Sequence, residues 1–422
     1  MRVSSLAEGS NGQAQQDAFM TTSPVPGSDL RGAARLAFDA VLGVIGVVET
    51  MHGTILRHTS LLPSPKGERT GGITGLVYSA VRGCTHLAGA SVDAAIVLLD
   101  PVLPSEHPAA GSEAARAALN GVLGDHLVRT ANPLAIPMRL RSGGLPLQLQ
   151  KDSLRDLAPL TGRLVVLVHG LCLNDRHWNY GGHDHGAALA RDLGYTPLYL
   201  YYNAGLHISS NGRTFAHLLQ ALAAEWPVPV EELVIIGHSM GGLVARSACH
   251  YGAAQGQDWL RHLRALIFLG TPHHGAPMER GGQWLDLLLK RNPYTAPFTK
   301  LGRIRSAGIT DLRYGNLLDS DWEDRNRFEH IGDTRQPVPL PKSVECFTMA
   351  AVTGSQAGAL RDRLLGDGLV PLQSALGEHE EPHHTLLIPA DHQWVGRGMN
   401  HFDLLGRQEV YEQMRLWLER RA

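Results

Sequence analysis

The segment 237–241, Gly-His-Ser-Met-Gly, has residue types and spacing that could supply a serine nucleophile. It matches the pattern Gly-x-Ser-x-Gly. The apolar run 232–236 precedes it and predicts a strand, and residues 242–249 predict a helix. A serine between a strand and a helix, flanked by glycines, is typical of a nucleophile elbow, a tight turn that exposes the hydroxyl. We therefore predict that Ser239 is a nucleophile and that its flanking glycines leave room for the backbone.

A serine nucleophile also requires a base and a carboxylate. The hydroxyl is weakly nucleophilic until a base takes its proton, and in this arrangement the acid and then the histidine follow the serine along the chain. Asp367 lies between two glycines in a turn that suits the end of a strand, and His401 lies just before an amphipathic C-terminal helix. We predict His401 as general base and then general acid, with Asp367 fixing its tautomer.

Other residues could fill these two roles. The chain has 22 histidines, and His392 also follows the last strand that we predict. It lies closer to that strand than His401 and is less well placed to extend over the elbow, so we favour His401. Asp362 and Asp391 are alternative carboxylates. We favour Asp367 because its flanking glycines and the following Val-Pro suit a turn at the end of a strand.

An oxyanion hole is the third part of such a site. The run 164–168 is unbroken and apolar, which suits a strand buried on both faces, and it ends in His-Gly-Leu-Cys. Beside a nucleophile elbow, one backbone N–H comes from the loop after that strand and one from the residue after the nucleophile. These N–H groups belong to Leu171 and Met240. We interpret His169 as a supporting residue rather than a catalyst.

Five segments together resemble the α/β-hydrolase superfamily and, within it, bacterial lipases and esterases related to PGAP1-like hydrolases. They are residues 169–171, 237–242, 270–275, 367–371 and 400–401. The pair Gly-His-Ser-Met-Gly-Gly and Gly-Thr-Pro-His-x-Gly is the most specific part, and the resemblance covers about residues 163–420. It implies hydrolysis of a carboxylic ester through an acyl-enzyme, without a cofactor. It determines neither the acyl chain nor the alcohol.

Apolar runs alternate with helical patterns, which predicts an α/β fold with a mostly parallel sheet flanked by helices, here the α/β-hydrolase fold. The expected strands are 164–168, 198–202, 232–236, 265–269, 344–352 and, last, 385–388; the expected helices are about 185–193, 212–226 and 242–249. Gly143 and Gly144 indicate a hairpin that leads into the sheet. The catalytic domain is predicted over residues 136–422.

A long segment within that domain, 276–343, has weak periodicity and predicts a cap or lid insertion. Four of its apolar side chains are predicted to bind substrate: Trp284, Leu287, Leu288 and Phe298. The alternative, which the sequence leaves open, is that these side chains only pack the insertion onto the sheet.

The N-terminal part of the chain has a different character. Residues 1–28 are polar and predict a disordered tail, and 29–135 predict a helical region with helices at about 31–57, 71–99 and 112–130. The uncharged run of the first helix is far shorter than the 18 or so residues of a membrane span. Four interpretations remain open: a small helical bundle, packing on the catalytic domain, a homo-oligomer interface, or attachment to a lipid or granule surface.

Composition excludes several function classes. The net charge of −2 indicates no nucleic-acid partner, and neither a His-Glu-x-x-His motif nor Cys/His finger spacing supports a metal site. The four cysteines lack Cys-x-x-Cys spacing, and the start lacks the basic and apolar regions of a signal peptide. We therefore predict a cytoplasmic protein with no cofactor and no metal, with peripheral membrane or granule association left open.

The function that these observations favour is hydrolysis of hydrophobic acyl esters by a serine carboxylic ester hydrolase of the lipase or esterase type. One alternative is a membrane-, granule- or partner-binding protein with vestigial catalysis. Another is an acyltransferase that uses the same three side chains to transfer the acyl group to an alcohol.

Overall fold

The computed structural model describes residues 28–59, 72–99, 110–276, 306–325, 332–354 and 366–420. By its contacts the chain divides into two compact units. Unit 1 includes Ala110–His126 and the residues from Ile136 on, and unit 2 includes the two N-terminal helices and Leu127–Ala135. The sequence grouped the third N-terminal helix with the first two, whereas most of that helix, α4 (Ala110–Arg129), belongs to unit 1.

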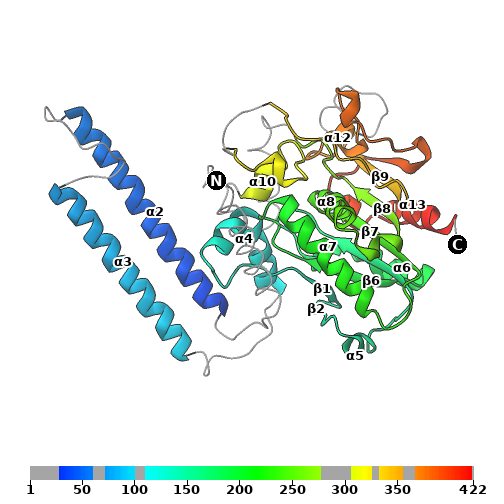
Figure 1. Cartoon of the computed structure of the whole chain (residues 1–422), viewed down its shortest axis with the longest axis horizontal. Coiled ribbons are helices and arrows are strands. Elements are labelled where there is room, and N and C mark those ends of the chain that lie inside the picture. Colours follow the sequence, from blue (N-terminus) through cyan, green and yellow to red (C-terminus); the bar gives the residue numbers. More distant parts are fainter. Residues whose placement is uncertain are drawn as a thin grey trace. The chain divides into compact units, whose positions relative to one another are not determined.

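An eight-stranded sheet lies at the centre of the described part of unit 1 (Figure 1), with strand order β10-β9-β8-β7-β3-β6-β1-β2. Its strands are β1 (Arg139–Ser142), β2 (Leu145–Pro146), β3 (Arg163–Val168), β6 (Thr196–Tyr201), β7 (Glu232–His238), β8 (Leu263–Leu269), β9 (Glu345–Val352) and β10 (Gln393–Arg397). The pairs from β10 to β6 are parallel, and β1 pairs antiparallel with β6 and β2. The carboxyl ends of six strands therefore share one edge.

The helices that flank the sheet are α6 (His185–Leu193), α7 (Ile208–Glu225), α8 (Met240–Ala254) and α13 (Gln408–Glu419). Shorter helices are α5 (Lys151–Leu154), α10 (Ala307–Asp311) and α12 (Leu372–Leu376). The 3-10 helices are η2 (Asp175–Trp178), η3 (Asp258–Arg261), η6 (Asp319–Asp321), η7 (Pro382–His384), η8 (Ala390–His392) and η9 (Asp403–Leu405). A separate two-stranded ribbon consists of β4 (Asn179–Tyr180) and β5 (His183–Asp184).

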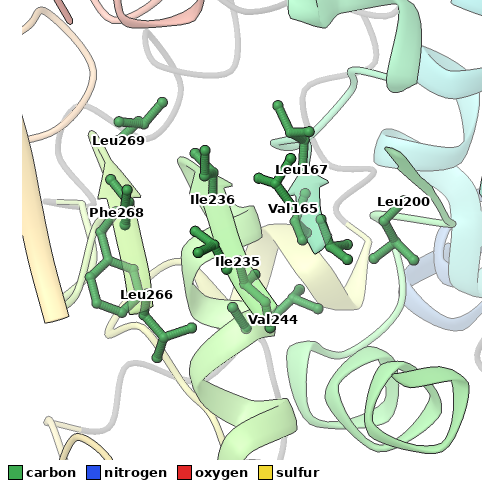
Figure 2. Close-up of a cluster of buried hydrophobic side chains, with 14 of the residues drawn as sticks. Val165, Leu167, Leu200, Ile235, Ile236, Val244, Leu266, Phe268 and Leu269 are labelled. Atoms are coloured by element: carbon green, nitrogen blue, oxygen red, sulfur yellow. The ribbon is translucent and has the colours of Figure 1, made fainter. Parts of the chain in front are cut away.

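The core lies on the central strands β3, β7 and β8, whose side chains are packed together in Figure 2. Val165, Ile235 and Phe268 are fully buried there. Helices cover both faces of such strands, so their sequences read as continuous apolar runs rather than alternating ones. The first five predicted strands and the three predicted helices are confirmed, as is the hairpin at Gly143 and Gly144 between β1 and β2.

The predicted last strand, 385–388, is wrong. No ladder forms there, and β10 pairs in parallel with β9 instead. Pro382 and Pro389 enclose the run closely, and a proline lacks the N–H that a central ladder needs. Leu386 and Ile388 are buried while Leu387 is 92% exposed, so the run packs by alternate side chains without a partner strand.

Unit 2 contains two long helices, α2 (Ser28–Thr59) and α3 (Gly72–Leu99), at the positions that the sequence predicts. Ion pairs join them: Arg31 and Arg35 both contact Asp93, and Arg82 contacts Glu49. Hydrogen bonds from Arg31 and Arg35 hold the pKa of Asp93 well below its usual value. Among the described residues, no helix has the combination of length and apolar character required to cross a membrane.

Candidate active site

Ser239 lies in the turn between β7 and α8, with a backbone φ of 54° and ψ of −124°. A positive φ is unusual for a residue with a side chain, and it is the strained conformation that a nucleophile elbow imposes. The Ser239 N–H donates to Leu269 O at 2.8 Å, which ties the turn to the end of β8. The serine is 4% exposed.

The elbow has no space for side chains at its glycines. A Cβ on Gly241 would lie 2.2 Å from Val168 O, and one on Gly237 would lie 2.5 Å from Gly242 N and Cα. The expectation that these glycines leave room for the backbone is confirmed. Gly170 is similarly constrained, because its Cβ would lie 3.0 Å from the Ser239 Cβ. The loop after β3 therefore contacts the nucleophile directly.

This packing predicts that Gly241→Ala destabilises the fold. The added Cβ would meet backbone oxygen, which cannot rotate away, so we expect the free energy of unfolding to fall by about 3 kcal/mol. Chemical denaturation measures the change. Gly332→Ala is the matched control, because a Cβ at Gly332 meets nothing within 4 Å. Equal stability of the two variants would contradict the close packing at the elbow.

Asp367 and His401 form a buried hydrogen-bonded pair. The His401 Nδ1–H donates to Asp367 Oδ2 at 2.6 Å. The other carboxylate oxygen, Oδ1, accepts the N–H groups of Leu369 at 2.9 Å and Val370 at 2.8 Å, and the His401 N–H donates to Asp367 O at 3.2 Å. A carboxylate can only accept here, so the proton is on Nδ1 and the Nε2 of His401 is left as a base.

Two glycines shape the turn that presents this carboxylate. Gly366 and Gly368 flank Asp367 with φ of +50° and +94°, values that glycine adopts without steric cost. A Cβ on Gly366 would also lie 1.9 Å from Val370 O. The glycine pattern that favoured Asp367 in the sequence therefore has a conformational cause.

The ring of His401 lies at the same edge of the sheet as Ser239. A Cβ on Gly270, directly after β8, would be 3.0 Å from Nδ1 and Cε1 of His401. The His401 ring is also 4.6 Å from the ring of His238, the residue before the nucleophile. In the described part of the chain, Ser239 Oγ forms no hydrogen bond with His401. Catalytic hydrogen bonds in free enzymes are often long and tighten when substrate binds.

Leu171 and Met240 occupy the positions expected of the two oxyanion donors, after β3 and at the start of α8. Neither of these N–H groups donates a hydrogen bond to any of the described residues. Cys172, the residue after Leu171, has a φ of +60°, so the loop is strained beside the nucleophile. Both donors thus remain available for a ligand.

The alternative base lies at the opposite edge of the sheet. His392 precedes β10, its ring is 4.2 Å from that of Phe347, and its Nδ1 is 3.2 Å from Cys346 O, near the start of β9. Because β9 and β10 are parallel, this is the edge where strands begin, whereas Ser239 lies where they end. Asp391 is adjacent to His392. The remaining alternative, Asp362, lies outside the described residues.

Sequence reasoning missed two buried histidines that hold the segment carrying His401. The His238 Nε2–H donates to His401 O at 3.1 Å, and the His185 Nε2–H donates to Leu404 O at 3.0 Å. His238 is the variable position of the Gly-x-Ser-x-Gly pattern, so the motif gave it no signal. His169, which we interpreted as a supporting residue, stacks on Tyr202 with ring centroids 4.4 Å apart.

These histidines predict a stability that depends on pH. Burial lowers the pKa of His169 and of His185 to about 3, and that of His238 well below its usual value. The unfolded chain therefore binds more protons than the folded one between about pH 6.5 and pH 3. Stability is complete above this window and falls as the pH decreases through it. Between about pH 7.5 and 5, we expect a loss of about 2 kcal/mol for each such histidine.

Denaturant unfolding at both pH values measures this loss. His185→Gln should be less stable at pH 7.5 because it alters the contact with Leu404 O, but its stability should depend less on pH. An identical pH dependence in the variant and the wild type would show that His185 is not held neutral by burial.

The four predicted substrate-binding residues, Trp284, Leu287, Leu288 and Phe298, lie outside the described residues. The described remainder of the insertion is linked to α8 by Arg246, which donates to Val338 O at 2.7 Å. A cavity of about 770 Å³ adjoins Arg246, and its lining includes none of the three predicted catalytic side chains. This cavity therefore does not define an acyl site.

One group within the described residues could hold a metal ion. Glu381, His383 and His384 each place a ligand atom within 4.8 Å of the others, and two of the three are exposed. His383 and His384 both belong to η7, with ring centroids 4.4 Å apart. The absence of a metal site remains a prediction.

A protein-family model matches the part of the chain that includes Ser239. Residues 159–336 match the model for the family described as PGAP1-like alpha/beta domain. This part of the chain is similar to PGAP1-like α/β domains. The domain has the α/β-hydrolase fold that the sequence predicted. The match includes Ser239 and the segment 270–275, and it ends before Asp367 and His401.

Several solved structures are similar to this chain. The lipase BlEst2 of Bacillus licheniformis, in mature form, has 16% identity and a TM-score of 0.39, covering 67% of this chain and 96% of that one. The esterase Pf2001 of Pyrococcus furiosus has 14% identity and a TM-score of 0.35, covering 62% and 82%. Lipase B of Aspergillus fumigatus has 13% identity and a TM-score of 0.34, covering 64% and 58%. Similarity at this level says nothing about substrate. The search of curated proteins finds no match.

Proposed function

We propose that this protein is a serine hydrolase that cleaves carboxylic esters with hydrophobic acyl groups through an acyl-enzyme. The observation that carries the proposal is the buried bond of 2.6 Å between His401 Nδ1 and Asp367 Oδ2, at the same sheet edge as the strained Ser239. It leaves an oriented imidazole base beside a serine in an elbow. The lipase and esterase structures named above are consistent with ester chemistry but do not carry the proposal.

The first half of the reaction forms the acyl-enzyme. Ser239 Oγ attacks the ester carbonyl carbon while its proton passes to His401 Nε2, and the Asp367 carboxylate stabilises the resulting imidazolium. The N–H groups of Leu171 and Met240 donate hydrogen bonds to the carbonyl oxygen and stabilise the negative charge that develops on it. One such donor typically changes the rate by about 10²–10³. The intermediate collapses as His401 gives its proton to the leaving alkoxide, which departs as an alcohol.

The second half regenerates the enzyme. A water molecule attacks the acyl carbon and gives a proton to His401, and collapse of the second intermediate returns that proton to Ser239 Oγ and releases the acid. An alcohol in place of this water would give acyl transfer by the same steps. The steps require no group beyond the side chains and backbone named here.

A covalent serine probe tests the proposal against a protein that only binds. A fluorophosphonate should label the native protein at Ser239 and should fail to label the denatured protein, because the hydroxyl is reactive only beside an ordered base. Peptide mapping locates the label. Hydrolysis of p-nitrophenyl esters, followed in parallel, measures turnover. Absence of both labelling and turnover would support the alternative of vestigial catalysis.

A preference for longer acyl chains is the expected specificity. The insertion follows the segment 270–275, and Gly270 at its start adjoins the His401 ring. Apolar side chains there would bury the acyl chain, adding about 0.8 kcal/mol, or about fourfold in kcat/KM, for each methylene until the site is filled. Charged acyl groups should be poor substrates.

A series of p-nitrophenyl esters from acetate upward measures this profile. Trp284→Ala should lower kcat/KM for medium or long chains more than for acetate, which serves as the internal control. A profile that is highest for acetate and falls steadily would rule out an extended acyl site, while leaving the ester chemistry intact.

A further inference from the structure

Five charged side chains of the hairpin formed by α2 and α3 pair with one another between the two helices. Asp93 accepts from Arg31 at 2.6 and 2.9 Å and from Arg35 at 2.8 and 2.7 Å, and Arg82 pairs with Glu49. These five side chains are only 3% to 34% exposed. Paired in this way, the charges are neutralised between the two helices rather than presented to water.

Three hydroxyl groups of the hairpin are also satisfied within their own helices. Thr50 Oγ1 donates to Gly46 O, Thr85 Oγ1 to Val81 O and Ser91 Oγ to Leu87 O, each at 2.9 Å. A hydroxyl that donates to the carbonyl four residues earlier needs no water for its proton. This bonding lowers the free energy needed to transfer these helical turns from water into an apolar medium.

The outer surface of the hairpin is apolar. On α3, Leu76 is 71% exposed, Leu87 70% and Leu98 79%, and this spacing of 11 residues places them on one face. The other exposed large apolar side chains are Leu30, Val41, Val44, Val48, Val77, Val81, Val92 and Val97. Among the side chains described in 28–50 and 75–98, no aspartate, glutamate, arginine or lysine is exposed. A water-facing helix pair normally has the reverse arrangement.

The width of this apolar surface indicates whether it contacts lipid or a second copy of the chain. At 100° per residue, the exposed leucines and valines of α3 cover an arc of about 220°. Association with a second copy would need a narrower seam, since a coiled-coil contact uses a stripe only two positions wide in seven. A helix that is apolar over most of its circumference suits hydrocarbon, which surrounds it on every free side.

We propose that the α2–α3 hairpin inserts its outer apolar surface into a phospholipid layer and so attaches the protein to membranes. We mean insertion from one side of the layer, since no described helix combines the length and the apolar character needed to cross a bilayer. The attachment would bring a hydrolase of hydrophobic esters to substrates that are poorly soluble in water. The inference itself does not rest on the proposed function, because it uses no residue of the candidate active site.

Flotation of the full-length protein with vesicles of pure phosphatidylcholine tests the insertion. Wild-type protein should float with the vesicles, equally at low and high salt, because the exposed side chains described in the hairpin include no aspartate, glutamate, arginine or lysine. In the triple variant Leu76→Glu, Leu87→Glu, Leu98→Glu, the partition coefficient into vesicles should fall by at least about a hundredfold. Each leucine that is buried in the lipid contributes favourable free energy to binding. A matched control replaces three exposed leucines of unit 1, Leu145, Leu387 and Leu416, by glutamate and should float like the wild type.

Two further measurements separate folding and catalysis from attachment. Hydrolysis of a soluble ester and far-UV circular dichroism should be unchanged in the hairpin variant, and Ser239→Ala should float like the wild type. Wild-type protein that does not float overturns the proposal, as does a hairpin variant that floats normally. The proposal is also overturned if the wild-type protein binds no vesicles but forms a concentration-dependent dimer that the triple variant abolishes. It is overturned as well if the triple variant loses activity on the soluble ester, because this surface would then pack against the rest of the chain.

Discussion

Replacing Ser239 by alanine should lower ester hydrolysis by a factor on the order of 10⁴ or more while leaving the fold intact. The change removes the oxygen that attacks the carbonyl carbon, and no other group at the elbow can take its place. The backbone should tolerate it, because Oγ forms no hydrogen bond in the described part of the chain and the small Cβ is retained. Steady-state hydrolysis of a p-nitrophenyl ester and thermal denaturation together measure both expectations.

Ser210→Ala is a suitable control for this variant. Ser210 lies on α7 in the same unit, and its hydroxyl has no hydrogen-bond partner among the described residues; its carbonyl oxygen accepts from Thr214 Oγ1 at 3.0 Å. It should retain full activity and full labelling by a serine-directed probe. If Ser239→Ala keeps more than a few per cent of wild-type turnover, then Ser239 is not the nucleophile, and the elbow has only a structural role.

Replacing His401 by alanine should be nearly as damaging as replacing Ser239, because members of a catalytic triad act as a unit. Without the imidazole, no base accepts the serine proton and no acid protonates the leaving group. Asp367→Asn should lower kcat severely, by as much as about 10⁴, because an amide favours the wrong tautomer of His401. Its effect should not exceed that of His401→Ala, since the task of Asp367 is to orient His401. Values of kcat for the same ester measure these effects.

His392→Ala and Asp391→Asn are the matched controls, and both should retain wild-type kcat. They remove a histidine and a carboxylate from the opposite edge of the sheet, where the His392 Nδ1 lies 3.2 Å from Cys346 O. An inactive His392→Ala variant beside an active His401→Ala variant would mean that the base has been assigned to the wrong residue. A triple variant of Ser239, Asp367 and His401 should be no less active than the Ser239 variant alone.

Local patterns in the sequence were sufficient for much of the fold. Five strands were predictable because strands covered on both faces need unbroken apolar runs, and the elbow was predictable because its glycines have steric causes within a few residues. Pattern alone misplaced the last strand. The run 385–388 is the more apolar, yet Gln393–Arg397 forms the ladder with β9, because pairing depends on which segment reaches a free edge.

The choice of histidine illustrates what the sequence could and could not determine. Motif order indicated a base near the C-terminus, and the glycines around Asp367 indicated the acid, because both signals are local. Whether His401 or His392 approaches the elbow depends on which edge of a parallel sheet each occupies, and this is a property of strand direction rather than of residue type. The fold alone likewise decided the role of His238 and His185. They hold the segment that carries His401 by donating to backbone oxygens of that segment.

Unit 2 shows the same division. Sequence periodicity determined that α2 and α3 are helices, because helix formation depends on neighbouring residues. It did not determine which faces meet. Only the tertiary structure showed that Asp93 and Glu49 pair with arginines of the opposite helix, and therefore that the apolar side chains face outward. Contacts between residues 33 or more positions apart arise from the packing of whole helices, and no local pattern specifies them.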